Sequence, residues 1–236
     1  MSRGASARRA AAAAVTGVVV YVAVDVVLVF LRPHLSVLHN AESDYGSAGK
    51  WGWVMNVNFV LRCALSLAVV FALSRVVTSR RITPSLWLLG IWGLASGLLA
   101  FFPDDPVGTK TVGTSAKMHL LLAFIAFACV LVGTIWASRV LRRQDGWEPV
   151  STLLQVLSWV AIVPILALGR VHLRPRSLGG LWEKVFLGIE LAWFPILRAE
   201  RYREHIRHDR YVFGRPCFCS AGLHRDDRDV FDNRQC

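Results

Sequence analysis

Long, unbroken blocks of apolar residues constrain the fold of this chain more than any other feature of its sequence. The hydrocarbon core of a bilayer is about 30 Å thick, and a helix needs about 20 apolar residues to cross it. Blocks of this length and their short connections use up most of the 236 residues, so no large soluble domain remains. We therefore predict an all-α fold, a polytopic membrane helix bundle of about six transmembrane helices.

The predicted spans follow one another along the chain and differ in strength. They cover residues 14–31, 53–74, 84–102, 118–138, 150–168 and 181–196. The first resembles the apolar core of a signal peptide, but it is too long and lacks a small-residue cleavage site, so we expect it to be retained. The last is the weakest, because it is short and contains Glu190 and Pro195. We divide the chain into a basic N-terminus (1–13), the transmembrane domain (14–198) and a basic, partly disordered tail (199–236).

The chain carries a formal net charge of +11, which in a soluble protein would suggest nucleic-acid binding. Here the arginines cluster between the apolar blocks, as they do when they encode membrane topology, so we expect no nucleic-acid partner. More of these clusters lie on the side of the N-terminus, although the third outer loop is also basic. We therefore predict a multi-pass protein of the cell membrane with both termini in the cytoplasm. The abundance of Arg, Ala and Val favours a bacterial source.

Four ionisable residues stand out inside predicted spans, where each costs a few kcal/mol unless it is paired or solvated: Asp25, Arg62, Glu190 and, at the start of the fourth span, His119. By helix rise, Asp25 lies roughly 9 Å below the outer surface, and Arg62 and Glu190 lie roughly 13 Å below it. Because these depths agree, we predict an outward-facing polar pocket lined by the three residues and by Asn58. The alternative is a structural ion pair between Asp25 and Arg62 that joins two helices and has no further role.

A second group of polar residues lies around the outer loop between the third and fourth spans. Asp104 and Asp105 follow Pro103, and His119 stands at the start of the next span. Because the loop is short, we expect these side chains to lie near one another. Carboxylates beside a histidine can transfer protons or bind a metal ion, but aspartate is also common where it satisfies the amides of a helix end. The sequence leaves both interpretations open.

No cofactor or metal site is predicted. The chain has neither a glycine-rich nucleotide loop nor a haem-attachment sequence. The tail contains Cys217-x-Cys219 followed by His224, but structural zinc sites need a second pair of ligands at a fixed distance.

Two glycines four residues apart, Gly93 and Gly97, give the third span a surface that another helix can approach closely. This spacing is common in apolar spans, so we expect it to serve packing within the bundle and not a dimer. Pro164 and Pro195 are expected to kink the fifth and sixth spans.

Three motifs lie near the outer ends of the spans. They are Arg32-Pro33 leading to Ser43-Asp44-Tyr45-Gly46, Phe102-Pro103-x-Asp105 with Thr111-x-Gly113 and His119, and Gly180-Leu181-Trp182-Glu183-Lys184. In these motifs the chain resembles the prokaryotic membrane proteins grouped as domain of unknown function 998 (DUF998). The resemblance covers about residues 14–200, implies a six-helix membrane fold and gives priority to Asp105 and His119. It implies no reaction, and Asp104 stands where that family usually has threonine.

We carry three hypotheses for function, of which the first is a protein that binds or moves a ligand in the outer pocket. The ligand would be a lipid-like or small amphipathic molecule, such as an isoprenoid, and membrane lipids would be the natural partners. Its binding residues would be Asp25, Asn58, Arg62 and Asp104. Another hypothesis is an accessory or sensory subunit whose basic tail docks a partner or anionic lipid.

The remaining hypothesis is an intramembrane enzyme acting on an isoprenoid or lipid. Asp105 or Glu190 would be the general acid, and His119 would be the base or would orient the acid. This requires the three residues to converge within about 6 Å around a closed apolar cavity. A purely structural role predicts instead that Asp25 contacts Arg62 and that no cavity is present.

Overall fold

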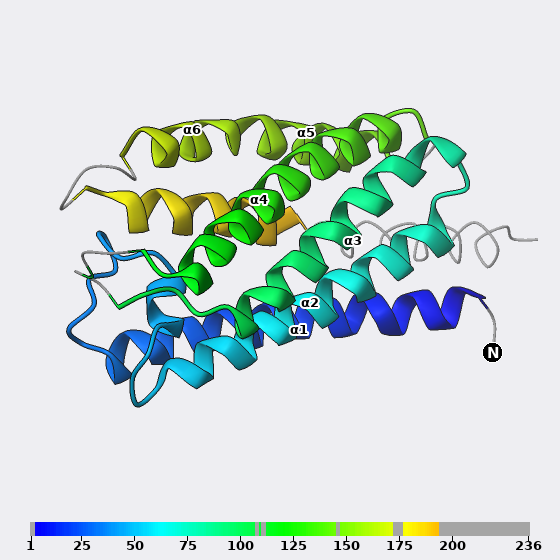
Figure 1. Ribbon diagram of the computed structural model, residues 1–236. Coiled ribbons are helices and arrows are strands. Elements are labelled where there is room, and N and C mark those ends of the chain that lie inside the picture. The colour runs from blue at the N-terminus through cyan, green and yellow to red at the C-terminus, as the bar shows by residue number, and fades with distance from the viewer. Residues whose placement is uncertain (1–2, 107–108, 110–111, 145–146, 172–176, 194–236) are drawn as a thin grey trace, which may run out of the picture.

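The structure of the protein, a computed structural model, describes residues 3–106, 109, 112–144, 147–171 and 177–193 (Figure 1). The long helices are α1 (Arg3–Leu31), α2 (Gly52–Val76), α3 (Thr83–Leu98), α4 (Thr114–Leu141), α5 (Glu148–Val160) and α6 (Ile162–Val171). Short 3-10 helices are η1 (Ser43–Gly46), η2 (Arg80–Ile82) and η3 (Leu99–Phe101). A further helix covers residues 179–193. No strand occurs among the described residues, so the predicted all-α fold is confirmed.

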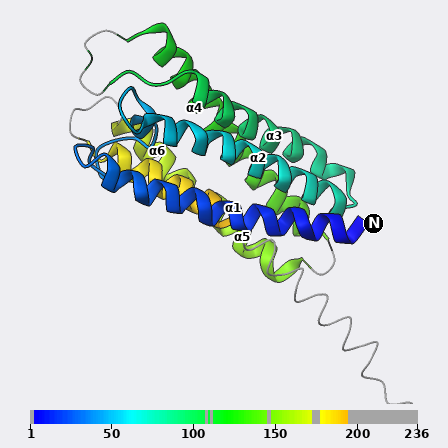
Figure 2. The ribbon, with the colours of Figure 1, turned by 90° about the horizontal axis from the view of Figure 1, so that it is seen from below.

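Helices that follow one another in the chain run antiparallel and pack together, α1 on α2, α2 on α3, α3 on α4 and α4 on α5 (Figures 1 and 2). The N-terminus of α1 and the connection 77–82 therefore lie at one end of the bundle, which we call the basic end. The connections 32–51 and 102–106 lie at the opposite end, which we call the loop end (Figure 1).

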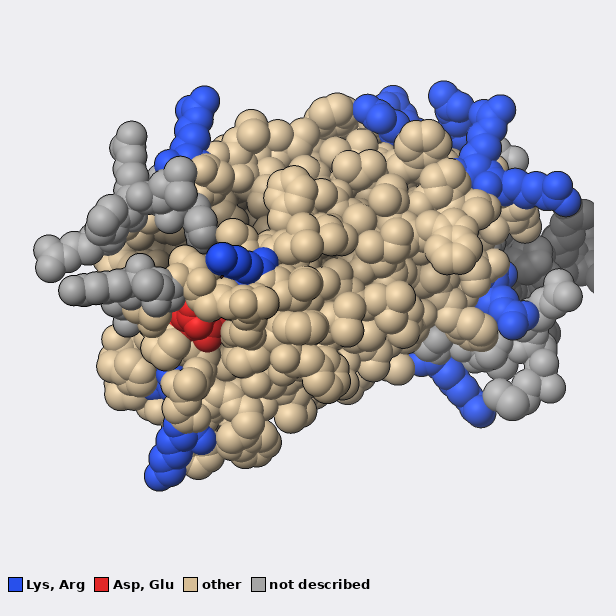
Figure 3. Space-filling view, viewed as in Figure 1, with Lys and Arg blue, Asp and Glu red and all other residues tan. Residues whose placement is uncertain are grey.

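The flank between the two ends carries few charged side chains (Figure 3). Large apolar side chains such as Val19, Phe124 and Leu166 keep 64%, 71% and 63% of their surface exposed. Five segments of the described chain are long and apolar enough to cross a membrane: Ala12–Leu31, Gly52–Arg75, Arg80–Phe101, Thr114–Leu141 and Val150–Arg170. Exposed apolar side chains on such helices face lipid. The chain is therefore an integral membrane protein built from helices.

Helix 179–193 corresponds to the sixth predicted span and lies inside the bundle. Phe186 contacts Phe127 of α4, with ring centroids 5.2 Å apart, and Leu191 lines a small void together with residues of α1, α2 and α3. Phe186 and Trp193 are almost fully buried. Because its neighbours cover much of it, this helix needs fewer apolar residues than one that faces lipid on most sides, which explains its weak sequence signal. Residues 194–196 of the prediction, and the tail 199–236, lie outside the described residues.

The predicted fifth span is a helix interrupted at Ala161, where α5 ends and α6 begins. Pro164 follows three residues later and has no N–H to donate to the carbonyl of Val160, so the regular hydrogen-bond ladder fails there. The regular helix is thus interrupted in the span where the proline kink was expected. Pro195 lies outside the described residues.

The seam between α2 and α3 depends on Gly93 and Gly97. A Cβ atom on Gly93 would lie 2.7 Å from Cβ of Ser66, and one on Gly97 would lie 2.8 Å from Cβ of Cys63. Real side chains do not approach so closely, and the glycines therefore allow α3 to rest against α2. The prediction that this motif serves packing within the bundle is confirmed.

Candidate functional site

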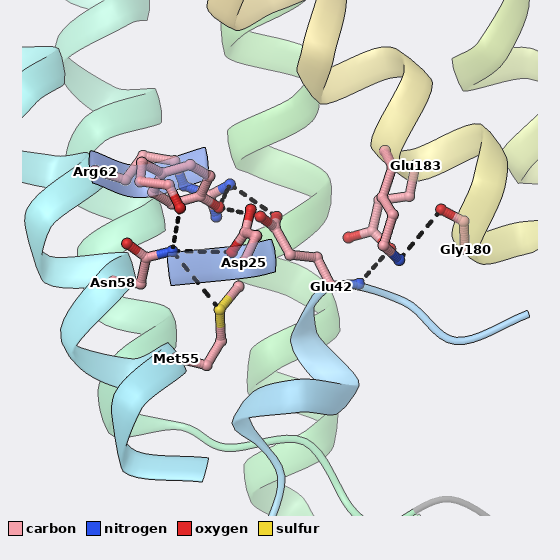
Figure 4. Close-up of polar contacts among 9 residues, drawn as sticks. Asp25, Glu42, Met55, Asn58, Arg62, Gly180 and Glu183 are labelled. Atoms are coloured by element: carbon pink, nitrogen blue, oxygen red, sulfur yellow. Dashed lines mark hydrogen bonds and ion pairs between the residues drawn. The ribbon is translucent and has the colours of Figure 1, made fainter. Parts of the chain in front are cut away.

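Arg62 of α2 is the centre of a buried cluster of polar side chains toward the loop end (Figure 4). Its Nη1 donates hydrogen bonds to the Tyr21 hydroxyl at 2.9 Å and to Oε2 of Glu42 at 3.2 Å. The Tyr21 hydroxyl in turn donates to Oε1 of Glu42. The guanidinium also lies 5.0 Å from the centre of the Phe59 ring, within range of a cation–π contact. The buried positive charge is therefore paired inside the protein.

The acidic partner of Arg62 comes from a loop and not from a helix. The ion pair is Arg62 with Glu42, and no ion pair joins the described side chains of Arg62 and Asp25. The predicted structural ion pair between Asp25 and Arg62 is therefore wrong, because the acidic residue that pairs with Arg62 is Glu42. Glu42 takes that position because the connection 32–51 folds back over the open end of the bundle and carries its carboxylate inward (Figure 4).

Asp25 and Asn58 join the same cluster from α1 and α2 (Figure 4). Asn58 Nδ2 donates to Oδ1 of Asp25 at 2.9 Å and to the backbone carbonyl of Tyr21 at 3.2 Å. Tyr21 and Asp25 are four residues apart and so share one face of α1, which turns toward α2. Three of the predicted ligand-binding residues, Asp25, Asn58 and Arg62, are thus brought together.

The loop that carries Glu42 is folded around a second buried arginine, Arg32. Its Nη1 donates to the backbone carbonyls of Tyr45 at 2.8 Å and Ser47 at 3.1 Å. Asp44 supports the same turn, because its Oδ2 accepts from the backbone N–H of Ala41 at 2.9 Å. Buried backbone carbonyls need donors, and a single guanidinium supplies several. Arg32 therefore fixes the path of the loop.

Helix 179–193 closes the cluster from the other side (Figure 4). Glu183 Oε2 accepts from the backbone N–H of Glu42 at 3.1 Å, and Lys184 Nζ donates to the carbonyl of Asn40 at 2.8 Å. Gly180 permits this approach, since a Cβ atom there would lie 2.1 Å from the carbonyl oxygen of Asn40. The loop and the helix are thereby held together by both backbone and side-chain contacts.

A pocket of about 160 Å³ opens beside this cluster. It is lined by Asp25, Val26, Leu28, Val29, Val37, Glu42, Tyr45, Met55 and Lys184. The lining is mainly apolar, and three of its members have ionisable side chains. Val26 keeps 52% of its surface exposed on the flank of α1, so the wall of the pocket continues onto the lipid-facing surface.

The composition of this lining differs from the predicted pocket. Asp25 lines it as expected, but Arg62 borders a separate void of only about 10 Å³. Glu42 and its bond to Tyr21 stand in front of Arg62, which is why the guanidinium does not reach the larger pocket. Asn58 is buried and bonded to Asp25, and it is not among the lining residues.

The outer loop between α3 and α4 uses its two aspartates differently. Asp105 Oδ2 accepts from the backbone N–H of Gly113 at 2.7 Å, which closes the loop in front of α4. Asp104 Oδ1 accepts from the backbone N–H of Asp105 at 2.8 Å. Burial raises the pKa of the Asp104 carboxyl, and the nearby His119 opposes that rise. Asp105 therefore fits the interpretation in which aspartate satisfies backbone amides near a helix end. Asp104 is the carboxylate whose pKa is lowered by the nearby His119.

His119 is buried at the start of α4, with 3% of its surface exposed. Its Nδ1 lies 2.7 Å from the carbonyl oxygen of Phe102, and a carbonyl only accepts, so this nitrogen carries a hydrogen. The other ring nitrogen, Nε2, makes no hydrogen bond to the described residues. The ring lies against Phe59, with centroids 6.3 Å apart. His119 thus ties the segment after η3 to α4, and both its ring and the Arg62 guanidinium lie near Phe59.

Glu190 stands apart from both groups. It keeps 1% of its surface exposed, and neither carboxylate oxygen makes a regular hydrogen bond within the described part of the chain. Thr134 of α4 is the polar side chain that faces it. Thr134 lies about 22 Å along α4 from His119. The three residues considered for acid–base catalysis, Asp105, His119 and Glu190, are therefore not gathered at one point.

Four residues that build the site were not among the predicted ones: Tyr21, Glu42, Glu183 and Lys184. Tyr21 could have been found from its position one helical turn before Asp25. Glu183 and Lys184 belong to the third motif of the family resemblance, which was the available signal. Glu42 has no signal in a single sequence, because a carboxylate in a connection between spans is ordinarily solvated.

Comparison with known proteins gives one match. The family described as "Protein of unknown function (DUF998)" matches residues 15–199, which is most of the chain. No curated protein and no solved structure matches it. The matched region contains every helix from α2 onward, the loop that carries Glu42 and all the residues of the pocket. The chain belongs to the DUF998 family.

Proposed function

We propose that this protein binds a lipid-like, amphipathic molecule in the pocket beside Asp25. The observation that carries the proposal is the makeup of that pocket, which combines apolar walls from α1 with the polar side chains of Asp25, Glu42 and Lys184. Amphipathic ligands need an apolar surface for the chain and a few placed polar groups for the head. A purely structural cluster would need no such space beside it.

The position of the pocket also supports a ligand that comes from the membrane. Val26 lies on its wall and on the exposed flank of α1. A lipid could therefore keep its chain along α1 while its head enters the pocket, without leaving the bilayer. More basic side chains lie at the opposite end of the bundle than at the loop end (Figure 3), which favours a pocket at the outer surface of a bacterial cell membrane and termini in the cytoplasm.

The enzyme and sensory hypotheses have less support. Catalysis by Asp105, His119 and Glu190 would need those groups around one substrate, and Glu190 faces Thr134 deep in the bundle instead. The sensory hypothesis depends on the tail 214–236, which lies outside the described residues.

The experiment is to fill the pocket and measure the lipid that stays bound. Val29 lines the pocket, whereas Val27, two residues earlier on the same helix, is exposed and does not line it. The protein would be purified in mild detergent and its retained lipid counted by native mass spectrometry. We expect Val29→Trp to lose the bound molecule and Val27→Trp to keep it, with similar thermal unfolding of both. If the unchanged protein retains no lipid, or if both variants retain it equally, the proposal fails.

A further inference from the structure

Glu190 is a buried ionisable residue that belongs neither to the pocket nor to the polar cluster around Arg62. It stands one helical turn after Phe186, so both side chains lie on one face of helix 179–193. Phe186 contacts Phe127 of α4, and Glu190 faces Thr134, two turns further along the same helix. The fold thus places a carboxyl group in the seam between two helices, with 1% of its surface exposed.

Thr134 has no hydrogen to give to a carboxylate at this position. Its hydroxyl donates to the backbone carbonyls of Val130 at 2.9 Å and Leu131 at 3.1 Å. A hydroxyl has one hydrogen, and once that hydrogen is committed the oxygen can only accept. Neither carboxyl oxygen of Glu190 has a hydrogen-bond partner in the described part of the chain. The described surroundings of Glu190 therefore supply no donor.

No positive charge of the described chain compensates Glu190 either. Arg62 borders the small void that Leu191 also lines, but its guanidinium is engaged by Glu42 and by the Tyr21 hydroxyl. No ionisable side chain among the described residues acts electrostatically on Glu190. An ionised carboxylate that is buried without a partner is so costly that the group takes up a proton instead.

We infer that Glu190 is a proton-binding site inside the bundle, and that helix 179–193 packs against α4 with this carboxyl group in its acid form. The ligand of the site is a proton. The neutral acid has a hydrogen to offer to the Thr134 oxygen and can lie in an apolar seam. The carboxylate would need water or a cation, which the described seam does not supply.

Helix 179–193 also connects Glu190 to the loop end of the bundle. Two turns earlier it carries Glu183 and Lys184, whose hydrogen bonds hold the loop 32–51. Loss of the proton would favour positions of the helix in which water reaches the carboxylate, and these loop contacts would weaken as a result. The inference does not depend on the proposed lipid-binding function, because it concerns the folded bundle alone.

Infrared difference spectroscopy of the full-length protein tests the acid form directly. A protonated carboxyl group has a carbonyl band that is separate from the bands of a carboxylate. The spectrum of the unchanged protein minus that of Glu190→Gln, both at neutral pH, should contain the protonated band and no carboxylate band. The Asp25 side chain is hydrogen-bonded to Glu42, so this pair also holds a proton, and the subtraction removes its signal. A carboxylate band in the difference spectrum would overturn the inference.

The same substitution at two buried glutamates gives a stability test. Glutamine is neutral and has nearly the shape of the acid form, so Glu190→Gln should leave the thermal unfolding temperature within about 2 °C of the original. Glu42→Gln removes the anionic partner of Arg62 and should lower that temperature by several degrees. A loss for Glu190→Gln as large as that for Glu42→Gln, or a failure to fold, would mean that Glu190 is ionised and paired.

The pH dependence of unfolding supplies the sign. A glutamate exposed by unfolding ionises above about pH 4.3. Unfolding above that pH then releases the proton from Glu190, so a rising pH lowers the stability of the folded protein. From about pH 5 to about pH 8, the unfolding temperature of the unchanged protein should fall more steeply than that of Glu190→Gln. The other ionisable groups are common to both proteins. Parallel curves would contradict proton binding at Glu190.

Discussion

At the scale of single residues, the most demanding group in the bundle is the guanidinium of Arg62. It is 4% exposed and depends on Glu42 and Tyr21 for its hydrogen bonds. Removing one partner of a buried ion pair typically costs about 3–5 kcal/mol, because the other charge is left unpaired. Removing both partners together costs less, since nothing charged is then left behind.

This asymmetry gives a prediction for Glu42. We expect Glu42→Gln to destabilise the protein by about 3 kcal/mol, and the double variant Glu42→Gln, Arg62→Met to lose less than the two single changes combined. Chemical unfolding in detergent, analysed as a double-mutant cycle, measures the difference. Lys50→Gln removes an exposed charge from the same loop and is the control, with an expected effect within about 0.5 kcal/mol. Additive losses in the cycle would contradict the pairing.

The sequence was informative about these residues only where a polar group stands in an apolar span. Asp25, Asn58 and Arg62 were found because insertion of such groups into a membrane is costly and demands partners. Glu42 was missed because its energetic cost arises only after its loop has folded into the bundle. The Asp25–Arg62 pair was wrong for the same reason, since a third residue outside the spans competes for the guanidinium.

At the scale of elements, the α2–α3 seam depends on having no side chain at Gly93. A Cβ atom there would meet Cβ of Ser66 at 2.7 Å, whereas one on Gly90 of the same helix would meet nothing within 4 Å. Overpacking a tight contact costs about 1–3 kcal/mol, and glycine-to-alanine changes at unhindered helix positions stabilise by about 0.5–1 kcal/mol.

Gly93→Ala and Gly90→Ala are therefore a matched pair. We expect Gly93→Ala to lower the thermal unfolding temperature and Gly90→Ala to leave it unchanged or raise it. Both changes add one methyl group to α3, so helix propensity cancels in the comparison. Equal unfolding temperatures for the two variants would mean that the seam relaxes freely, contrary to the geometry.

Elements were predicted well where they face lipid and less well where they face protein. The first five spans stand out because a membrane-exposed helix must be apolar on its surface. Helix 179–193 gave a weak signal because neighbouring helices cover it, so Glu183 and Glu190 are permitted there. Pro164 predicts an irregularity in the fifth span, but the helix is interrupted three residues earlier, at Ala161.

At the scale of the whole molecule, the basic end and the loop end define which way the bundle is inserted. Basic connections favour the cytoplasmic side, and the connection 77–82 carries Arg80 and Arg81. We therefore expect a cysteine at Thr78 to be cytoplasmic and one at Lys50 to face outward; both positions are exposed. In a background with the native cysteines replaced, a membrane-impermeant maleimide should label Lys50→Cys in intact cells.

Thr78→Cys should be labelled only after the membrane is opened. Labelling of Thr78→Cys in intact cells with protection of Lys50→Cys would reverse the orientation. That result would also place the pocket beside Asp25 at the cytoplasmic leaflet.

The central position of helix 179–193 bears on how the protein is made. The surfaces of α1 to α4 that it contacts are synthesised before it, so these contacts form only after helix 179–193 has been made. Until it arrives, the backbone N–H of Glu42 lacks its acceptor on Glu183, and the loop lacks its anchor on Lys184. The polar cluster at the loop end is thus completed only by a late docking event. Assembly of this cluster therefore depends on a helix made after α1 to α6, and a chain that stops before Gly180 would leave the Glu42 N–H without its acceptor on Glu183.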